Sequence, residues 1–198
     1  MIAVDVFEAI QNRRAVREYR SDQVSKGDIL AVLDAANLAP SALNRQQWEF
    51  IVVSGRKILE MGASYRSTLD EYLVHWDQSP MRDFIKKDAF IRFAETYGGA
   101  PVVIVVLTPV DALPNFRKAN IESASAALEN LMLAATALGL GTCWMTGPLR
   151  DEQTLRRILS VPDNREIVAV TPLGYPAVIP PAPPRIDPSL QEKAWWVE

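Results

Sequence analysis

Residues 120–138 read NIESASAALENLMLAATAL, the longest regular pattern in the chain. Apolar side chains recur in it at steps of three and four residues: Ile121, Ala124, Leu128, Leu131, Ala135 and Leu138. This period predicts one long helix, and its small residues suit close packing against other helices. Gly139 follows directly and can adopt the left-handed conformation that ends a helix. We expect this helix to be the centre of the fold.

A second strong pattern lies just before this helix, where residues 102–107 read VVIVVL. An unbroken run of β-branched residues is typical of a strand that is buried on both faces. Shorter patterns predict further strands at Trp48–Val53, Gly141–Met145 and Ile167–Leu173. The chain therefore combines a sheet with several helices.

The remaining helices are predicted from their caps. Asp5 can cap a first helix, in which Val6, Ile10 and the stem of Arg14 share one face. Ser25 and Asp28 form a capping signal for a second helix, which should stop before Pro40. Short helices are expected at 56–61 and 151–159, and helical pieces with loops at 64–99. No repeat or linker divides the chain, so residues 1–198 are interpreted as one domain.

Composition excludes several classes of protein. The 198 residues are 48% hydrophobic and carry a net charge of −3, which offers no footprint for a nucleic acid. A single cysteine, Cys143, argues against disulfides and indicates a reducing cytoplasmic setting. His75 is the only histidine, so we expect no metal site and no histidine-based triad. The amino terminus lacks the pattern of a signal peptide, and no apolar run is long enough for a membrane span, which predicts a soluble protein.

After Tyr175 the sequence changes to a proline-rich arm, residues 176–198, that ends in AWWVE. Such a segment is extended and cannot pack on itself. A floppy tail seldom carries two adjacent tryptophans, Trp195 and Trp196. We therefore expect the arm to dock either on the body of the chain or on a partner subunit.

Two polar segments could carry the chemistry of a site. Arg13, Arg14 and Arg17 place three guanidinium groups within five residues, which suits a phosphate dianion, although they could also be a solvated helix end. The loop Ala39–Trp48 reads APSALNRQQW and offers hydroxyl and amide groups that match a heterocyclic ring edge, although a plain polar turn would look similar.

Two further features are compatible with ligand binding. The loop Trp144–Leu149 reads WMTGPL, and Gly147 would allow a ligand to approach the backbone closely, unless the loop is a simple turn. Arg185 is an isolated charge in the arm that could reach a phosphate or face water. Because histidine is so scarce, an enzyme with this sequence would depend on a bound organic cofactor for its chemistry.

In this order the segments resemble the nitroreductase family across nearly the whole chain. The family has an Arg-Arg-Ser-x-Arg cluster and a Pro-Ser-x-x-Asn-x-Gln-Pro-Trp loop, which here read RRAVR and PSALNRQQW. Its long central helix matches residues 121–144, its glycine loop matches TGPL, and its LGYP motif with a proline- and arginine-rich arm matches LGYPAVIPPAPPR. Ala15 stands where serine is usual, Gln47 where proline is usual, and IDPS where an Arg-Lys-Pro stretch is common.

This resemblance implies an α+β fold: a three-layer α/β/α arrangement with a mostly antiparallel central sheet and a C-terminal arm exchanged across a homodimer. It also implies FMN at the dimer interface, with NADH or NADPH as co-substrate. The phosphate would be held by Arg13, Arg14 and Arg185, with Arg17 near the ribityl chain or the pyrimidine edge. The other implied cofactor-binding positions are Ala15, Pro40, Ser41, Asn44, Gln46, Thr146, Gly147 and Pro148.

The implied activity is a two-step transfer of electrons from NAD(P)H to a small acceptor: a nitroaromatic, a quinone or a flavin. No catalytic acid or base is expected from the protein, and Arg17 and the Gly147 N–H would tune the flavin. Aromatic residues in 64–99 would form a lid, or serve simply as core. Three alternatives remain: the same fold with enone reduction, dehalogenation or flavin breakdown, a non-catalytic FMN-binding protein, and a flavin-free binding module.

Overall fold

A four-stranded antiparallel sheet forms the middle of the molecule, in a computed structural model that describes residues 5–198. The strand order is β1-β2-β4-β3, with every pair antiparallel. The strands are β1 (Glu49–Ser54), β2 (Val102–Pro109), β3 (Gly141–Thr142) and β4 (Arg165–Gly174). Seven of the eight residues of β2 are buried, which confirms the prediction of a strand covered on both faces.

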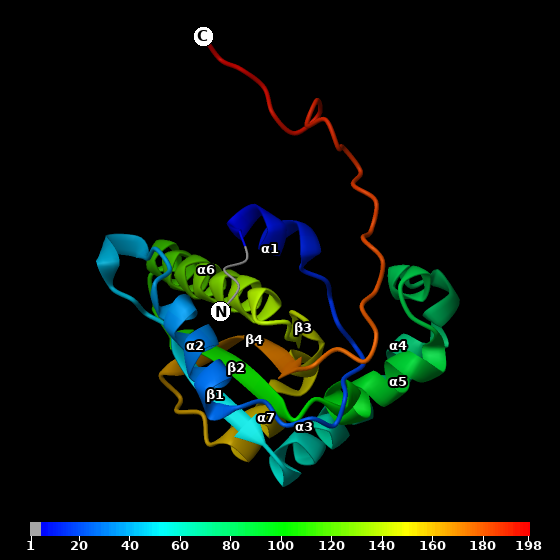
Figure 1. Cartoon of the computed structure of the whole chain (residues 1–198). Coiled ribbons are helices and arrows are strands. Elements are labelled where there is room, and N and C mark those ends of the chain that lie inside the picture. Colours follow the sequence, from blue (N-terminus) through cyan, green and yellow to red (C-terminus); the bar gives the residue numbers. More distant parts are fainter. Residues whose placement is uncertain (1–4) are drawn as a thin grey trace.

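Helices cover both faces of the sheet, so the fold has three layers (Figure 1). Alternate residues of β2 point to opposite layers, as the period of a strand requires. Val102, Ile104 and Val106 pack in one core with α2 (Lys26–Asn37) and α6 (Pro114–Ala137), and α1 (Val6–Asn12) lies against α6. Val103, Val105 and Leu107 pack in the other, with α3 (Arg56–Ser67), α4 (Asp70–Val74), α5 (Lys87–Thr96) and α7 (Glu152–Leu159).

The central helix exists as predicted but is longer. It begins at Pro114, six residues before Asn120, because proline is favoured in the first turn of a helix, where its missing N–H is not needed. Asp111 Oδ1 accepts from the Leu113 N–H at 3.0 Å just before this start. Gly139 has a φ of 74° and follows the last turn, as expected.

Three other boundaries differ from the sequence-based expectation. The helix expected at 56–61 continues to Ser67 because Ser64 and Tyr65 extend its buried face. The strand expected at 141–145 is only two residues long, and Met145 returns to β4 through an isolated bridge with Val170. The first helix ends at Asn12, before Arg14, and its only buried residue is Ala9.

The segment 64–99 packs largely as core. Besides α4 and α5 it contains short 3-10 helices at Trp76–Gln78, Pro80–Asp83 and Tyr97–Gly99. Five of its seven aromatic side chains are buried, whereas Tyr72 is half-buried and Phe84 is 59% exposed. His75 is exposed, as an ordinary surface histidine would be. A lid function for this segment stays a prediction.

The arm runs away from the body of the chain (Figure 1). Its base is held where the Ala177 N–H donates to the carbonyl of Glu18 at 2.9 Å. The side chains of Trp195, Trp196 and Val197 are 78%, 92% and 87% exposed. The first alternative, docking on the body of the same chain, is therefore wrong for this structure.

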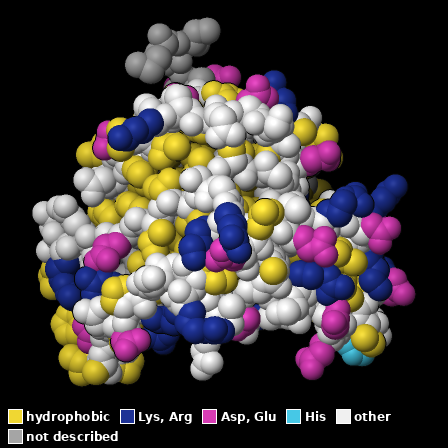
Figure 2. Space-filling model, turned by 90° about the horizontal axis from the view of Figure 1, so that it is seen from below, with side chains coloured by type: hydrophobic (Ala, Val, Ile, Leu, Met, Phe, Trp, Pro, Cys, Tyr) yellow, Lys and Arg dark blue, Asp and Glu magenta, His cyan; other side chains and the backbone are white. Residues whose placement is uncertain are grey.

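Several large apolar side chains are also exposed on the body. In α1 they are Val6, Phe7 and Ile10, and beside α6 they include Leu43. Figure 2 shows one face of the molecule, on which hydrophobic side chains form a continuous area while acidic and basic side chains are intermixed. None of the helices within residues 5–198 is both long and apolar enough to cross a bilayer. Residues 1–4, part of the stretch that we expect not to be a signal peptide, lie outside the described residues.

Candidate functional site

The arginine cluster lies on an extended segment that crosses the open edge of the sheet. The Val16 N–H donates to the carbonyl of Thr142 in β3 at 2.9 Å. Three residues further on, the Tyr19 N–H donates to Gly98 at 3.0 Å, and the Arg20 N–H donates to Tyr175 at 2.9 Å. These bonds fix the segment between β3, the end of α5 and the base of the arm. Arg17 is thus held between strand-like bonds, whereas Arg13 caps the end of α1, where its N–H donates to the Ala9 carbonyl at 2.9 Å.

The three guanidinium groups differ in their partners. Arg13 Nε lies 3.5 Å from a carboxylate oxygen of Glu129 in α6. Arg14 donates to the carbonyls of Gln11 and Arg13 at 2.6 and 2.8 Å, and Arg17 donates to Ala15 at 3.3 Å. Within residues 5–198, no carboxylate lies within 4.0 Å of Arg14 or Arg17. Two partly buried positive charges are therefore available for an anion.

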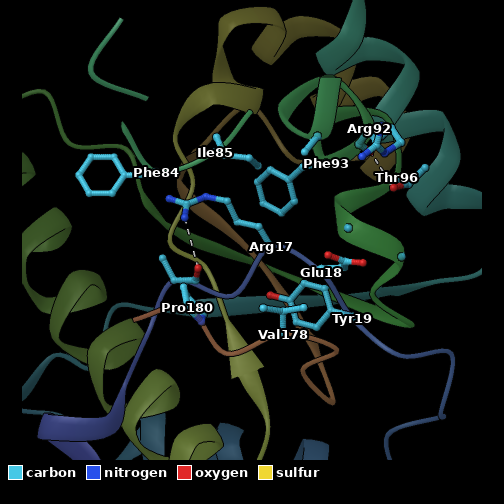
Figure 3. A pocket seen from close by; sticks show the side chains of 14 residues that line it. Arg17, Glu18, Tyr19, Phe84, Ile85, Arg92, Phe93, Thr96, Val178 and Pro180 are labelled. Carbon is cyan, nitrogen blue, oxygen red and sulfur yellow. Dashed lines mark hydrogen bonds between the residues drawn. The ribbon is translucent and has the colours of Figure 1, made fainter. Parts of the chain in front are cut away.

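A cavity of about 440 Å³ opens beside Arg17 (Figure 3). Arg17 extends between Phe84 and Phe93, while Tyr19 and Val178 lie on the opposite wall. The walls come from residues 15–19, from α5 and the turn before it, and from the base of the arm. The cavity therefore connects the arginine cluster to the 64–99 segment and to the arm.

A second, smaller cavity of about 250 Å³ lies on the other side of Arg17. Its walls are mainly aromatic, and its polar rim is formed by the turn after β3 and by Arg150. We call it the aromatic pocket; its ring-bearing residues are Tyr65, Tyr72, Phe90, Phe93 and Trp144. Arg17 and Phe93 line both cavities, so the arginine borders two hollows whose walls combine apolar and polar side chains.

Gly147 is pressed against the aromatic pocket. A Cβ atom at this position would lie 2.2 Å from the Tyr65 hydroxyl, so the backbone can approach only because the residue is glycine. Burial raises the pKa of Tyr65 to about 12, against the opposing effect of Arg150. The hydroxyl is consequently a neutral donor at physiological pH. Burial likewise raises the pKa of the Cys143 thiol, which keeps it protonated and unreactive.

The polar loop does not reach either cavity within one chain. It lies against α6, where the Ala42 N–H donates to Ser123 Oγ at 3.1 Å. Its conformation is fixed internally, because the Gln46 N–H donates to Ser41 Oγ at 3.0 Å and the Gln46 amide donates to Asn44 at 2.9 Å. Asn44 and Gln46 have φ angles of 51° and 49°. Ser123 lies six residues, about 9 Å along the helix, from the Glu129 that contacts Arg13.

The other predicted site residues are distributed as follows. Thr146 and Gly147 line the aromatic pocket, and Pro148 is buried in the 3-10 helix Gly147–Asp151. Pro40 lies with the polar loop, and Ala15 lines the larger cavity. Arg185 is exposed on the arm, three residues beyond Ala182, which shares a hollow with Arg14. Sequence reasoning missed Arg150, whose position one 3-10 turn after Gly147 was the available signal.

The chain matches known proteins over almost its full length. Residues 10–175 match the family described as "Nitroreductase family". A protein of Methanothermobacter thermautotrophicus, named "Putative NADH dehydrogenase/NAD(P)H nitroreductase", is 35% identical over 98% of this chain and 88% of its own. An iodotyrosine deiodinase of Thermotoga neapolitana is 24% identical over 91% of this chain and 93% of its own.

A solved structure has the same fold as this chain. It is a "putative nitroreductase in complex with fmn" from Desulfovibrio desulfuricans, and it is 25% identical to this chain. The TM-score is 0.74, with 97% of this chain and 98% of the other covered. The likeness extends over the three layers and the arm, because so little of either chain is left out.

Proposed function

Because the chain belongs to the nitroreductase family, we propose that it is an FMN-dependent oxidoreductase that transfers electrons from NADH or NADPH to a small aromatic acceptor in the cytoplasm. Nitroaromatics, quinones and flavins are the acceptor types that we propose. The observation that carries the proposal is the pair of unneutralised guanidinium groups of Arg14 and Arg17, of which Arg17 lines both the cavity of about 440 Å³ and the aromatic pocket.

The residues present fit a group that has a phosphate at one end and a flat ring at the other. Arg13, Arg14 and Arg17 supply fixed positive charge over a short segment, and Arg17 lines the cavity of about 440 Å³, where Phe84 and Phe93 offer flat faces. Beneath this segment, the Thr142 hydroxyl is buried and has no hydrogen-bond partner in the described part of the chain. An unsatisfied buried hydroxyl costs free energy, and a ligand with polar ring atoms could satisfy it.

We assign each residue a role on this basis. Arg13, Arg14 and Arg185 bind the phosphate, and Ala15 contributes only backbone because it lacks the family's usual hydroxyl. Arg17 stabilises negative charge at the polar edge of the ring, and the Gly147 N–H donates to the ring, since the first N–H groups of a helix have no intrahelical acceptor. When bound, FMN supplies the hydride chemistry, for which this chain offers orientation and charge.

The site requires a second copy of the chain. Three polar residues, Ser41, Asn44 and Gln46, lie in a loop that packs against α6 and lines neither cavity of its own chain. We propose that they bind the FMN of the partner subunit in a homodimer. The exposed apolar residues of α1 and the exposed arm tip support this arrangement, because both need a partner surface.

A different acceptor chemistry on the same site is the second candidate. The iodotyrosine deiodinase of Thermotoga neapolitana is comparable in length and similar throughout, which keeps reductive dehalogenation open. A panel of nitroaromatics, quinones, free flavin and halophenols, each with NADH and NADPH, separates these reactions. Turnover of halophenols alone would replace the nitroaromatic proposal.

The first experiment is an absorbance spectrum of the purified protein with added FMN, followed by anaerobic NADH or NADPH. We expect bound flavin that bleaches and recovers with oxygen. Arg17→Ala should slow the bleaching, whereas Arg56→Ala should not, because the Arg56 side chain is 91% exposed on α3. Protein that stays colourless, or equal bleaching rates in wild type and Arg17→Ala, would contradict the assigned roles.

A further inference from the structure

Arg150 is placed directly above the turn that approaches the aromatic pocket. The 3-10 helix Gly147–Asp151 begins at Gly147, and side chains three residues apart lie on the same face of such a helix. Three residues rise about 6 Å in this geometry. Arg150 therefore lies one 3-10 turn beyond Gly147, on the same face of this helix.

The guanidinium group of Arg150 is oriented but carries an uncompensated charge. It lies 4.9 Å from the centre of the Tyr72 ring, a cation–π contact that holds the group beside the pocket. Tyr72 is itself fixed by a hydrogen bond between its hydroxyl and Ser79. Across the described residues, no carboxylate lies within 4.0 Å of Arg150.

The acidic groups near Arg150 in the fold do not neutralise it. Asp151 accepts from the Thr154 N–H at 3.2 Å and from the Ser64 hydroxyl at 3.0 Å. Asp70 pairs with Arg66 at 2.7 Å. Glu71 shares an open hollow with Arg150 but forms no ion pair with it. Arg150 is thus available to donate a charge-assisted hydrogen bond to an anionic ligand.

The pocket beside Arg150 has the size and surface for one substituted ring. Its volume is about 250 Å³, and its walls combine the aromatic side chains named above with Leu69, Met81 and Met145. Phe90 and Phe93 are buried in the core and fix the far wall, so the pocket is largely preformed. The Tyr65 hydroxyl adds a hydrogen-bond donor to the wall, and because it is neutral it does not repel an anion.

We propose that Arg150 is a specificity-determining residue that selects acceptors in which a single aromatic ring carries a carboxylate. The inference rests on the proposed function and names the acceptor class for the same site. The ring lies among the aromatic side chains, and the carboxylate pairs with the guanidinium group of Arg150. For a nitro acceptor, the first two-electron step consumes one NAD(P)H and one proton, converts the nitro group to nitroso and releases NAD(P)+ and one water.

The test compares 4-nitrobenzoate with 4-nitrobenzamide, which has nearly the same shape but no charge. We expect wild type to favour the carboxylate, and Arg150→Gln to lower the ratio of the two kcat/KM values at least tenfold through KM, because a charge-assisted hydrogen bond is lost. Arg150→Lys should restore part of the ratio. Arg157→Gln is the matched control on α7 and should leave the ratio unchanged, since Arg157 donates to Thr154 and lines neither the aromatic pocket nor the hollow beside Arg150.

A binding measurement makes the test independent of turnover. Benzoate, which cannot be reduced, should bind the holoprotein in calorimetry, and Arg150→Gln should abolish this binding while benzamide binds neither variant. An unchanged kcat/KM ratio and unchanged benzoate affinity would overturn the inference while leaving the proposed function intact. A raised KM for NAD(P)H with an unchanged ratio would also overturn it, because Arg150 would then bind the donor. If wild type reduces no acceptor at all, the proposed function is contradicted. The affinity for benzoate would still decide the role of Arg150.

Discussion

Gly147 is the residue at which one added methyl group should most disturb the site. We predict that Gly147→Ala lowers the free energy of unfolding by about 1–3 kcal/mol, the usual cost of overpacking, because its Cβ meets the Tyr65 ring at 2.2 to 3.0 Å. The Tyr65 ring is buried, so it cannot easily move away from the added methyl group. Urea denaturation and FMN retention on gel filtration measure the two effects.

The matched control for this substitution is Gly27→Ala in the first turn of α2. A Cβ there meets only Ser25 Oγ, at an ordinary 3.6 Å. Alanine also favours the helical conformation by up to about 1 kcal/mol, so this variant should be as stable as wild type or slightly more stable. Equal stability of the two variants would show that the Tyr65 contact does not restrict Gly147.

Buried tyrosines should make the protein sensitive to alkali. Burial raises the pKa of Tyr19, Tyr65 and Tyr97 in the folded state, so unfolding releases protons once the pH exceeds about 10, the ordinary value. Their contribution to stability is complete below pH 10. For Tyr65 it is lost between pH 10 and about 12, at about 1.4 kcal/mol per pH unit.

Tyr97→Phe tests this at a single group. The Tyr97 hydroxyl is buried without a hydrogen-bond partner among the described residues, so its removal should leave stability at pH 8 unchanged or raise it by about 1 kcal/mol. The same variant should lose stability less steeply than wild type above pH 10. Urea midpoints at a series of pH values measure both effects. If stability falls equally steeply above pH 10 in wild type and in the variant, the pKa of Tyr97 is the same in the folded and unfolded states.

At the scale of the elements, a buried amide pair joins the polar loop to α6. Gln47 donates to Asn120 at 3.0 Å, and Asn120 donates to the carbonyl of Pro109 at the end of β2 at 3.1 Å. We predict that Asn120→Leu destabilises the protein by about 1–3 kcal/mol, because the Gln47 amide is left buried and unpaired.

Thermal unfolding checks this prediction, and Asn115→Leu, an exposed position on the same helix, is the control. The double variant Gln47→Leu, Asn120→Leu should recover part of the loss, since no amide then remains unpaired. Strict additivity of the two single substitutions would show that the residues do not interact.

The elements that could be predicted from sequence are those whose signal is local. The β-branched run of β2 and the apolar period of α6 gave the right structure because burial dictates their composition. The first turns of α6 were missed because the apolar period begins only at Ile121, although Pro114 was a local signal for the start; Arg117 adds an ion pair with Glu166 of β4 at 2.7 Å. The position of the polar loop depends on Ser123, far along the chain, and no local pattern encodes such a contact.

The candidate site also combines residues that local sequence predicts with residues that only the fold reveals. The arginine cluster and Gly147 could be identified because their residue types suit an anion and a close backbone approach. Arg150 could not, because its orientation depends on Tyr72, which belongs to a segment without a clear sequence period. Its missing carboxylate partner is likewise a property of the folded chain.

For the molecule as a whole, we propose that the arm sets the state of assembly. We predict that replacing Trp195 and Trp196 together by alanine shifts the protein from dimer to monomer and releases FMN, because both side chains are exposed in a single chain. Sedimentation velocity measures the shift. Replacing Glu192 and Lys193, exposed neighbours on the arm, should leave the dimer intact. A dimer unaffected by the tryptophan changes would mean that α1 and the rest of the body supply the interface.

The order of the strands has a consequence during synthesis on the ribosome. β2 pairs on one side with β1, which is already made, but on the other with β4, which follows about 60 residues later. At about 5–20 residues per second, a nascent chain exposes one side of VVIVVL for roughly 3–12 s. Such a run is prone to self-association, so the aggregation of this protein should depend on the rate of translation more than on the stability of the finished fold.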